Sequence, residues 1–262
     1  MSQRTFGNSF RARPTQSLVA LAAMCFWQSS TAVTTYAGLD FAANEFVAHT
    51  QSNAAAAAFD SATLLSGGLV RVDFESAALG QFTSLAPSPQ MTITGSFPSG
   101  GAGARSEIRN QSLEPGNARR GYNTTVGGAK FNQVYGGSQF FDFSTSIVGF
   151  GLYVSGMQNN ATLSFNDGVE RTISFSTLIP TGSNFNGGVW FVGFTSSGTP
   201  FSRVTISFLP VLGEPDSLGI DDIRYVTAVP EIGSFALCSA GLLLLLATRR
   251  FGRRVSGMPR PL

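Results

Sequence analysis

The sequence predicts an all-β protein: an antiparallel jelly roll or β-sandwich with one short N-terminal helix and a C-terminal transmembrane helix. Apolar and polar residues alternate at period two through much of 69–228, as in "VWFVGFT" and "FSRVTISF". Turn-rich segments such as "SGGAGARSE" separate these runs, and no long amphipathic pattern follows Gly68. About ten short strands of this kind are typical of a sandwich.

The alternation also predicts which strand residues face inward. In "IVGFGLYVSG" one face carries Val148, Phe150, Leu152 and Val154, and the other carries Gly149, Gly151 and Tyr153. Two later runs give the inward sets Trp190, Val192, Phe194 and Val204, Ile206, Phe208. Between two β-rich runs, Asn166-Asp167-Gly168 predicts a hairpin turn. The 23 phenylalanines of the chain would fill the space between two sheets.

An Ala-rich segment, 38–68, precedes the predicted sandwich. Within it, 51–68 has the composition of a helix, with Ser52 or Asn53 as N-cap and Gly67 as the stop. Ala55, Phe59 and Ala62 would form the stripe that packs on the domain. A disordered linker is the alternative for the same composition.

The N-terminal segment 1–37 is typical of a secretory signal peptide. Three arginines precede the apolar run "LVALAAMCFW", and small residues allow a signal peptidase to cut near Ala32 or Ala37. The two cysteines, Cys25 and Cys238, both lie outside the predicted sandwich, which therefore has no disulfide. Arginines cluster at the two ends, while acidic residues outnumber basic ones in the middle, so we expect no nucleic-acid partner.

The C-terminal segment 229–254 combines an uncharged apolar run, 232–247, with a following cluster of arginines. This pattern predicts a membrane helix with its basic end in the cytoplasm, and 255–262 as a cytoplasmic tail. "VPE", the apolar run and the arginines together resemble the PEP-CTERM sorting signal of Gram-negative bacteria, although Ile232 stands at the third motif position in place of proline. The residues that carry this resemblance are Val229, Pro230, Glu231, Arg249, Arg250, Arg253 and Arg254.

The PEP-CTERM resemblance implies a cellular route. Such proteins are exported, held briefly in the inner membrane, cut by an exosortase-like transpeptidase and passed to the cell surface or extracellular matrix. The same kind of tail occurs on some ice-binding proteins. A second resemblance, carried by "VDFESAALG", "PFSRVTISF" and "DSLGIDDIRY", is to the exported jelly-roll domains found before such tails and to MAM-type and carbohydrate-binding jelly rolls.

Few residues suggest catalysis. The sole histidine, His49, lies outside the strand pattern, and there is no G-x-S-x-G motif, which disfavours a serine hydrolase or a histidine-based zinc site. Glycoside hydrolysis needs two carboxylates, and any chain of this length offers some. The candidates are Glu75, Glu107, Glu114, Asp142, Asp167, Glu170 and Glu214.

A structural calcium ion is the one cofactor that the sequence suggests. The first and last strands of a jelly roll usually lie side by side, which would bring "VDFES" next to "GIDDIRY". Glu75 and Asp222, with Asp73 sharing the face of Glu75, would then supply oxygen ligands suited to Ca²⁺. Asp221 would point to the side opposite Asp222, and the alternative is that all these acids are exposed strand ends.

We therefore expect an exported, non-catalytic surface or matrix protein that binds exopolysaccharide. Binding would use exposed aromatic rings, with Tyr122, Tyr135, Tyr153 and Trp190 as candidates. The alternative is a secreted carbohydrate-active enzyme, a glycoside hydrolase or lyase on a jelly-roll scaffold. Ice binding is a third hypothesis, but "MTITG" and "NTTVGG" are too short to build a threonine ladder.

Overall fold

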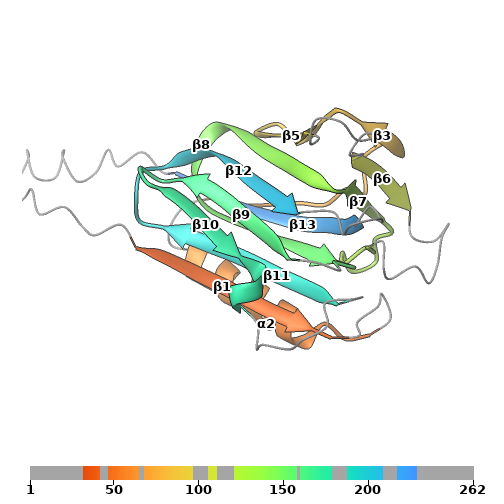
Figure 1. The fold of residues 1–262 in the computed structure, drawn as a ribbon, viewed down its shortest axis with the longest axis horizontal. Helices are drawn as coiled ribbons and strands as arrows, with labels where there is room; N and C mark the ends of the chain where they lie inside the picture. Colours follow the sequence, from red (N-terminus) through yellow and green to blue (C-terminus); the bar gives the residue numbers. More distant parts are fainter. Residues whose placement is uncertain are drawn as a thin grey trace, which may run out of the picture.

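The computed structural model describes residues 32–41, 47–64, 68–96, 106–110, 121–157, 160–178, 188–208 and 217–228. These residues form two packed layers of antiparallel strands with one α-helix against the outside (Figure 1). The predicted all-β sandwich with a helix near its N-terminus is thus confirmed. Over the described ranges, no helix has both the length and the hydrophobicity to cross a membrane, and segment 229–254 lies outside those ranges.

The described elements follow one another in the order β1, α2, then β2 to β13, with a 3-10 turn before β11. Their bounds are β1 Val33–Asp40, α2 Thr50–Thr63, β2 Leu69–Val72, β3 Gly80–Phe82, β4 Ser84–Ser88, β5 Met91–Ser96, β6 Ser106–Asn110, β7 Lys130–Tyr135, β8 Gly137–Ser155, β9 Ala161–Asn166, β10 Glu170–Ser174, η4 Phe175–Leu178, β11 Val189–Ser196, β12 Phe201–Phe208 and β13 Ser217–Thr227.

The long strand β8 belongs to both layers. Its first half pairs with β5 and β12, and β4, β9 and β10 extend that layer. Its second half pairs with β11 and β13, and β1, β2, β7, β6 and β3 extend the other layer. Hydrogen bonds therefore join thirteen described strands into one continuous sheet that folds over on itself.

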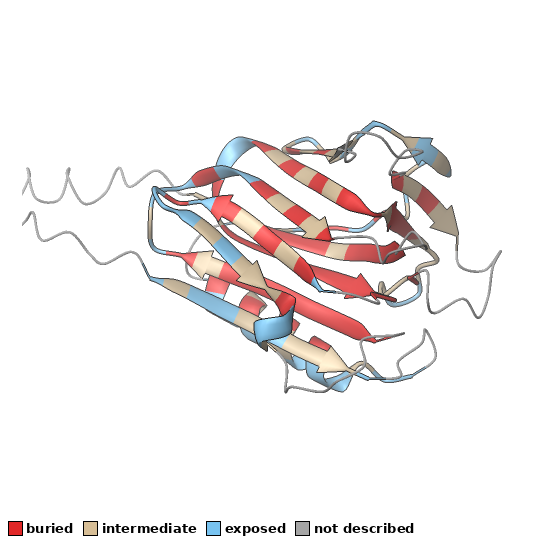
Figure 2. Cartoon of the chain, in the orientation of Figure 1, coloured by how far each residue is buried: buried red, intermediate tan, exposed pale blue. Residues whose placement is uncertain are grey.

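A phenylalanine-rich core fills the space between the layers, where buried residues alternate along the strands (Figure 2). Both predicted inward sets from β11 and β12 lie in this core: Trp190, Val192, Phe194, Val204, Ile206 and Phe208. Phe165 stacks on Phe194 with ring centroids 3.9 Å apart, next to the predicted hairpin turn at 166–168, which joins β9 to β10. Aromatic pairs of this kind add to the free energy gained from burying their area.

One inward residue was predicted wrongly. Phe150, Leu152 and Val154 lie in the core, but Val148 packs against a second cluster on the outer face of the β8–β11 layer. The pairing of β13 with β8 shifts register between Gly149 and Ile147. A one-residue slip exchanges the faces of the flanking residues, so Ile147 takes the core position that the period assigned to Val148.

Helix α2 covers the outer face of this layer, over β1, β11 and β8 (Figure 1). Ser52, Ala56, Phe59 and Thr63 are its buried side chains, whereas Ala62 of the predicted stripe is exposed. The prediction of a packed helix is confirmed, but of the predicted stripe only Phe59 is fully buried, and Ser52, Ala56 and Thr63 complete the buried face. Phe59 sits at the centre of the contact, with rings of Tyr36 and Phe191 at 5.6 and 5.9 Å.

The cap of α2 also differs from the prediction. His49 is the N-cap residue and makes no side-chain capping bond. The carboxylate of Asp40, at the end of β1, instead accepts hydrogen bonds from the backbone N–H groups of Gln51 and Ser52, each at 2.9 Å. A carboxylate at a helix N-terminus satisfies unpaired donors and favours the helix dipole. This contact fastens the helix to the end of the first strand.

Candidate functional site: a polar cavity beside helix α2

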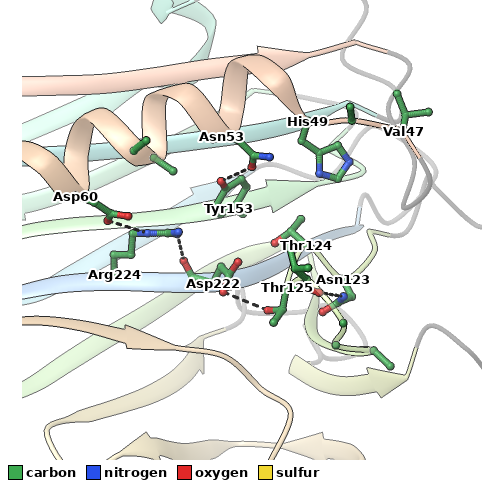
Figure 3. Close-up of a pocket in the computed structure, with 17 residues that line it drawn as sticks. Val47, His49, Asn53, Asp60, Asn123, Thr124, Thr125, Tyr153, Asp222 and Arg224 are labelled. Carbon is green, nitrogen blue, oxygen red and sulfur yellow. Dashed lines mark hydrogen bonds and ion pairs between the residues drawn. The ribbon is translucent and has the colours of Figure 1, made fainter.

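A cavity of about 750 Å³ lies on the outer face, between α2 and the loop that precedes β7. Figure 3 shows the side chains that converge on it: Asn53 and Asp60 from α2, Tyr153 from β8, Asp222 and Arg224 from β13, and Asn123, Thr124 and Thr125 from the loop. Val47 and His49 lie at the start of the helix. Ala56, Ala57 and Val126 add apolar surface to this lining.

The loop is held against β13 by glycines and by one buried carboxylate. Gly121 has φ 89° and lies so close to Gly219 that a Cβ on Gly121 would collide with the Gly219 backbone. Asp221, which is buried, accepts hydrogen bonds from the backbone N–H groups of Thr124 at 2.7 Å and Thr125 at 3.0 Å. These contacts fix the wall of the cavity that the loop provides.

Asp222 adopts a left-handed backbone conformation, with φ 45°, inside β13. The pairing of β13 with β8 shifts register between Asp221 and Arg224, so the strand bulges at this point. Thr125 Oγ1 lies 3.2 Å from Asp221 Oδ2 and 3.2 Å from Asp222 Oδ1. The prediction that the two aspartates point to opposite sides is therefore wrong, because the bulge removes the strict alternation of a strand.

Arg224 spans the floor of the cavity in a fixed position. Its Nε donates to Asp60 Oδ1 at 3.0 Å, and its Nη1 donates to the backbone carbonyl of Asp222 at 2.9 Å. The guanidinium also lies 5.3 Å from the ring centres of Tyr153 and Phe191. Asp60 also forms an ion pair with Arg71, with Arg71 Nη2 2.7 Å from Asp60 Oδ2. This network ties the helix to the sheet through charge-assisted hydrogen bonds.

Tyr153 was predicted to lie on the face opposite the core, and it does, but α2 covers that face. Its hydroxyl donates to Asn53 Oδ1 at 2.7 Å, as Figure 3 shows. Burial raises the pKa of Tyr153 to about 12, partly offset by the Arg224 charge. The hydroxyl therefore stays protonated and acts as a donor throughout the physiological range.

The two neighbouring aspartates are held in an environment that disfavours charge. Burial, and then the charge of Asp222, raises the pKa of Asp221 to about 7 against the hydrogen bonds from Thr124, Asp222 and Thr125. Burial also raises the pKa of Asp222, although Arg224 and Thr125 act in the opposite direction. Asp222 thus places a carboxyl group at the cavity wall. Ionisation of this group costs free energy because it is buried, and hydrogen bonds from a polar ligand would stabilise its ionised form.

The four predicted ligand-binding aromatics do not share a surface. Tyr122 and Trp190 are each 1% exposed and Tyr153 is 4% exposed, so the expectation of exposed rings is wrong for these three. They are covered because α2 and the 121–129 loop pack on the outer face, while Trp190 faces the core. Tyr135 is partly exposed on β7, where its hydroxyl is 3.1 Å from Arg109 Nη1.

The predicted neighbours β2 and β13 do lie side by side, with Val72 opposite Ile223. The carboxylate of Glu75 nevertheless has other partners: its Oε1 accepts from the backbone N–H groups of Ala129 and Lys130, each at 2.8 Å. The Lys130 ammonium donates to the backbone carbonyls of Glu75 and Ala77, also at 2.8 Å. Asp73 accepts from the Glu75 N–H at 3.1 Å.

These contacts bear on whether calcium fits. Within the described part of the chain, no three His, Cys, Asp or Glu side chains gather as a metal site. An ammonium group already occupies the two carbonyl oxygens beside Glu75, so a calcium ion there would have to displace it or bind beyond it. The calcium site of Asp73, Glu75 and Asp222 stays a prediction, and the contacts of Glu75 do not favour it.

Two of the carboxylates considered for hydrolysis are held in ion pairs away from the cavity. Asp142 pairs with Arg203 on the other layer, and Asp167 pairs with Arg171 beside the β9–β10 turn. Glu114, Glu214 and the sorting residues from Val229 to Arg254 lie outside the described residues.

Most of the cavity lining was not predicted from the sequence. Asp60 and Arg224 are 164 positions apart in the sequence, and they meet each other and Asn53 only through the packing of α2 on the sheet. The one available signal was "IDDIRY", where charged residues interrupt an apolar strand. Such charges inside a strand need partners, and here the helix supplies one.

Comparison with known proteins gives no family: no family model matches the chain, and no curated protein matches it. Among solved structures, the K2 cleaved adhesin domain of Lys-gingipain is 12% identical, with 62% of this chain and 99% of that chain covered and a TM-score of 0.39. A mutant family 29 carbohydrate-binding module, CBM29-2, is 12% identical over 63% of this chain and 100% of that chain, with a TM-score of 0.29.

A third similar structure is TmCBM61 in complex with β-1,4-galactotriose, which is 12% identical over 59% of this chain and 94% of that chain, with a TM-score of 0.27. At such identities and TM-scores, these likenesses carry no argument about the site of this protein.

Proposed function

We propose that this is an exported, non-catalytic surface or matrix protein that binds an exopolysaccharide chain in the cavity beside α2. The observation that carries the proposal is the cavity itself, about 750 Å³ in volume and lined by hydrogen-bonding side chains held in place by the fold. Ligand sites commonly have volumes of about 300–1,000 Å³ and combine apolar surface with a few fixed polar groups.

The chemistry of the lining suits a ligand rich in hydroxyl groups. Asp222 offers carboxyl oxygens, Asn53 an amide, and Thr124 a hydroxyl, next to the apolar surface of Ala56 and Ala57. Sugars present hydroxyl groups and C–H faces side by side. The polar side chains of the cavity can hydrogen-bond the hydroxyl groups, and its alanines can contact the C–H faces. Because Arg224, Asp60 and Thr125 are already held by hydrogen bonds, little side-chain entropy is lost when a ligand binds.

The position of the cavity fits a protein anchored by its ends. The register places four residues opposite one another across β1, β11, β8 and β13: Thr34, Thr195, Gly149 and Val226. The start of β1 and the end of β13 therefore lie at the same end of the layer. Asp40, which caps the start of α2, lies at the other end of β1. Val47 and His49 thus place the cavity toward the end of the layer that lies away from Val33 and Thr227.

The contacts of the cavity carboxylates favour binding over hydrolysis. A glycosidase needs one carboxyl as acid and a second as base or nucleophile. Asp222, with its raised pKa, is the one feature here that favours the enzyme alternative. Asp60, however, is held between Arg71 and Arg224, which leaves its carboxylate engaged rather than directed at a ligand.

The cellular route is part of the same proposal. Signal peptidase would remove the N-terminal segment, and an exosortase-like transpeptidase would act near Val229, Pro230 and Glu231 after a transient stay in the inner membrane. These segments lie outside the described residues. The resemblance of the tail to the PEP-CTERM signal supports this route, and so does the position of the tail directly after the sandwich in the sequence.

Binding can be tested by titrating the purified exported protein with exopolysaccharide fragments and with neutral oligosaccharides of three to six units. Asp222→Asn should weaken binding at least tenfold, because it replaces a carboxyl group that accepts hydrogen bonds by an amide, while asparagine tolerates the left-handed backbone. Glu170→Gln makes the same charge change on exposed β10 and should bind as the wild type does. Equal affinity of Asp222→Asn and wild type would overturn the site, and shortening of the oligosaccharides would support the enzyme alternative.

A further inference from the structure

We infer that signal peptidase cuts between Ala32 and Val33, and not after Ala37. The sequence admits both sites, because Ser30 and Ala32 place small residues at the −3 and −1 positions of the first, and Thr35 and Ala37 at those of the second. The inference rests on the export proposed above, and the structure distinguishes the two sites through strand β1.

Strand β1 pairs with β11 along its whole length, from Val33 opposite Ser196 to Asp40 opposite Val189. A cut after Ala37 would remove the first five residues of this eight-residue strand. The partner residues on β11, from Val192 to Ser196, would lose their hydrogen-bonded neighbour. The result would be a new open edge on a layer whose β11 residues are almost all buried, and such edges favour association with other chains.

The removed residues also pack against the rest of the domain. The ring of Tyr36 meets Phe59 of α2 edge-on at 5.6 Å, and Val33 packs against the main core. Only Gly38, Leu39 and Asp40 would remain to carry the helix cap that Asp40 provides. A mature chain that starts at Gly38 would therefore lose part of the support of α2, on which the cavity depends.

A cut before Val33 removes little. Ala32 is exposed, and its hydrogen bonds run to Ser197, with Ala32 N donating to Ser197 Oγ at 3.0 Å and Ser197 N donating to Ala32 O at 3.1 Å. Both partners lie at the surface, so water can replace these bonds at small cost. The complete strand, the packing of Tyr36 and the Asp40 cap are all retained.

N-terminal sequencing of the full-length chain, expressed with its own leader and recovered after export, tests the inference. The expected first residue is Val33. Because signal peptidase needs a small residue at −1, Ala32→Leu should slow processing, whereas the matched change Ala37→Leu should not. Both positions are exposed, so neither change should disturb the folded domain.

A first residue of Gly38, or blocked processing of Ala37→Leu alone, would overturn the cleavage site while leaving export intact. An exported protein that keeps the leader would overturn both this inference and the proposed route.

Discussion

Phe59→Ala tests whether helix α2 is a packed part of the domain or an appendage. Phe59 is 0% exposed and fills the space between Tyr36, Phe191 and the backbone of Gly193. Replacing a buried phenylalanine by alanine costs about 3–5 kcal/mol, from lost transfer free energy and from the cavity left behind. For a domain of this size each kcal/mol lowers the melting temperature by about 2–4 °C, so the expected fall is about 6–20 °C.

The effect should extend to the ligand site. An isolated helix of this length is marginal in water, so α2 depends on its packing for stability. Phe59→Ala should therefore loosen α2 and weaken saccharide binding, even where the β-sheet signal in circular dichroism is kept. Leu64→Ala is the matched control, because Leu64 follows the helix and is 72% exposed, and it should change stability by less than about 0.5 kcal/mol. A Phe59→Ala protein that melts within a degree of the wild type would refute the packing argument.

Three further predictions concern ionisation, metal binding and processing. Because the folded-state pKa of Asp221 is raised to about 7, its contribution to stability is present at low pH and is lost as the pH rises through about 7. Urea unfolding between pH 5 and 8.5 should show this loss of stability, and the loss should be smaller in Asp222→Asn, since the Asp222 charge helps to raise the pKa of Asp221. Equal losses in the variant and the wild type would contradict this prediction. If calcium binds through Glu75 and Asp222, calcium at about 100 times Kd should add roughly 2.7 kcal/mol, Glu75→Gln should abolish the gain, and identical melting in calcium and in chelator would end that prediction. Changing Pro230 or Glu231 should hold the protein in the inner membrane of a host with an exosortase, and mass spectrometry that finds the apolar tail on released wild-type protein would rule out this processing.

The fold was predictable from the sequence because its signals are local. Alternation placed Trp190, Val192 and Phe194 in the core without knowledge of their partners, and an Asn-Asp-Gly turn marked the β9–β10 hairpin. The error at Val148 came from a register shift, which leaves no mark on composition. The helix cap was missed for a similar reason: its acceptor, Asp40, lies on a strand and not in the sequence next to the helix start.

The cavity was less predictable because it is a product of packing. Tyr153 was assigned to the correct face of its strand, but the sequence did not show that α2 would bury that face. The opposed placement of Asp221 and Asp222 followed from ideal strand geometry, whereas the left-handed conformation of Asp222 turns both toward Thr125. Asp60 and Arg224 form an ion pair across 164 residues, and no pattern in either segment specifies the other.

Hydrogen exchange of the purified protein, with and without exopolysaccharide fragments, tests the central proposal most directly. We expect slower exchange on binding in α2, in the loop at 121–129 and around Asp222, since these segments enclose the cavity. The exposed β10 strand on the opposite layer should exchange at the same rate in both states. Protection confined to the β4, β5, β9 and β10 layer, or no protection at saturating saccharide, would contradict the assignment of the cavity as the binding site.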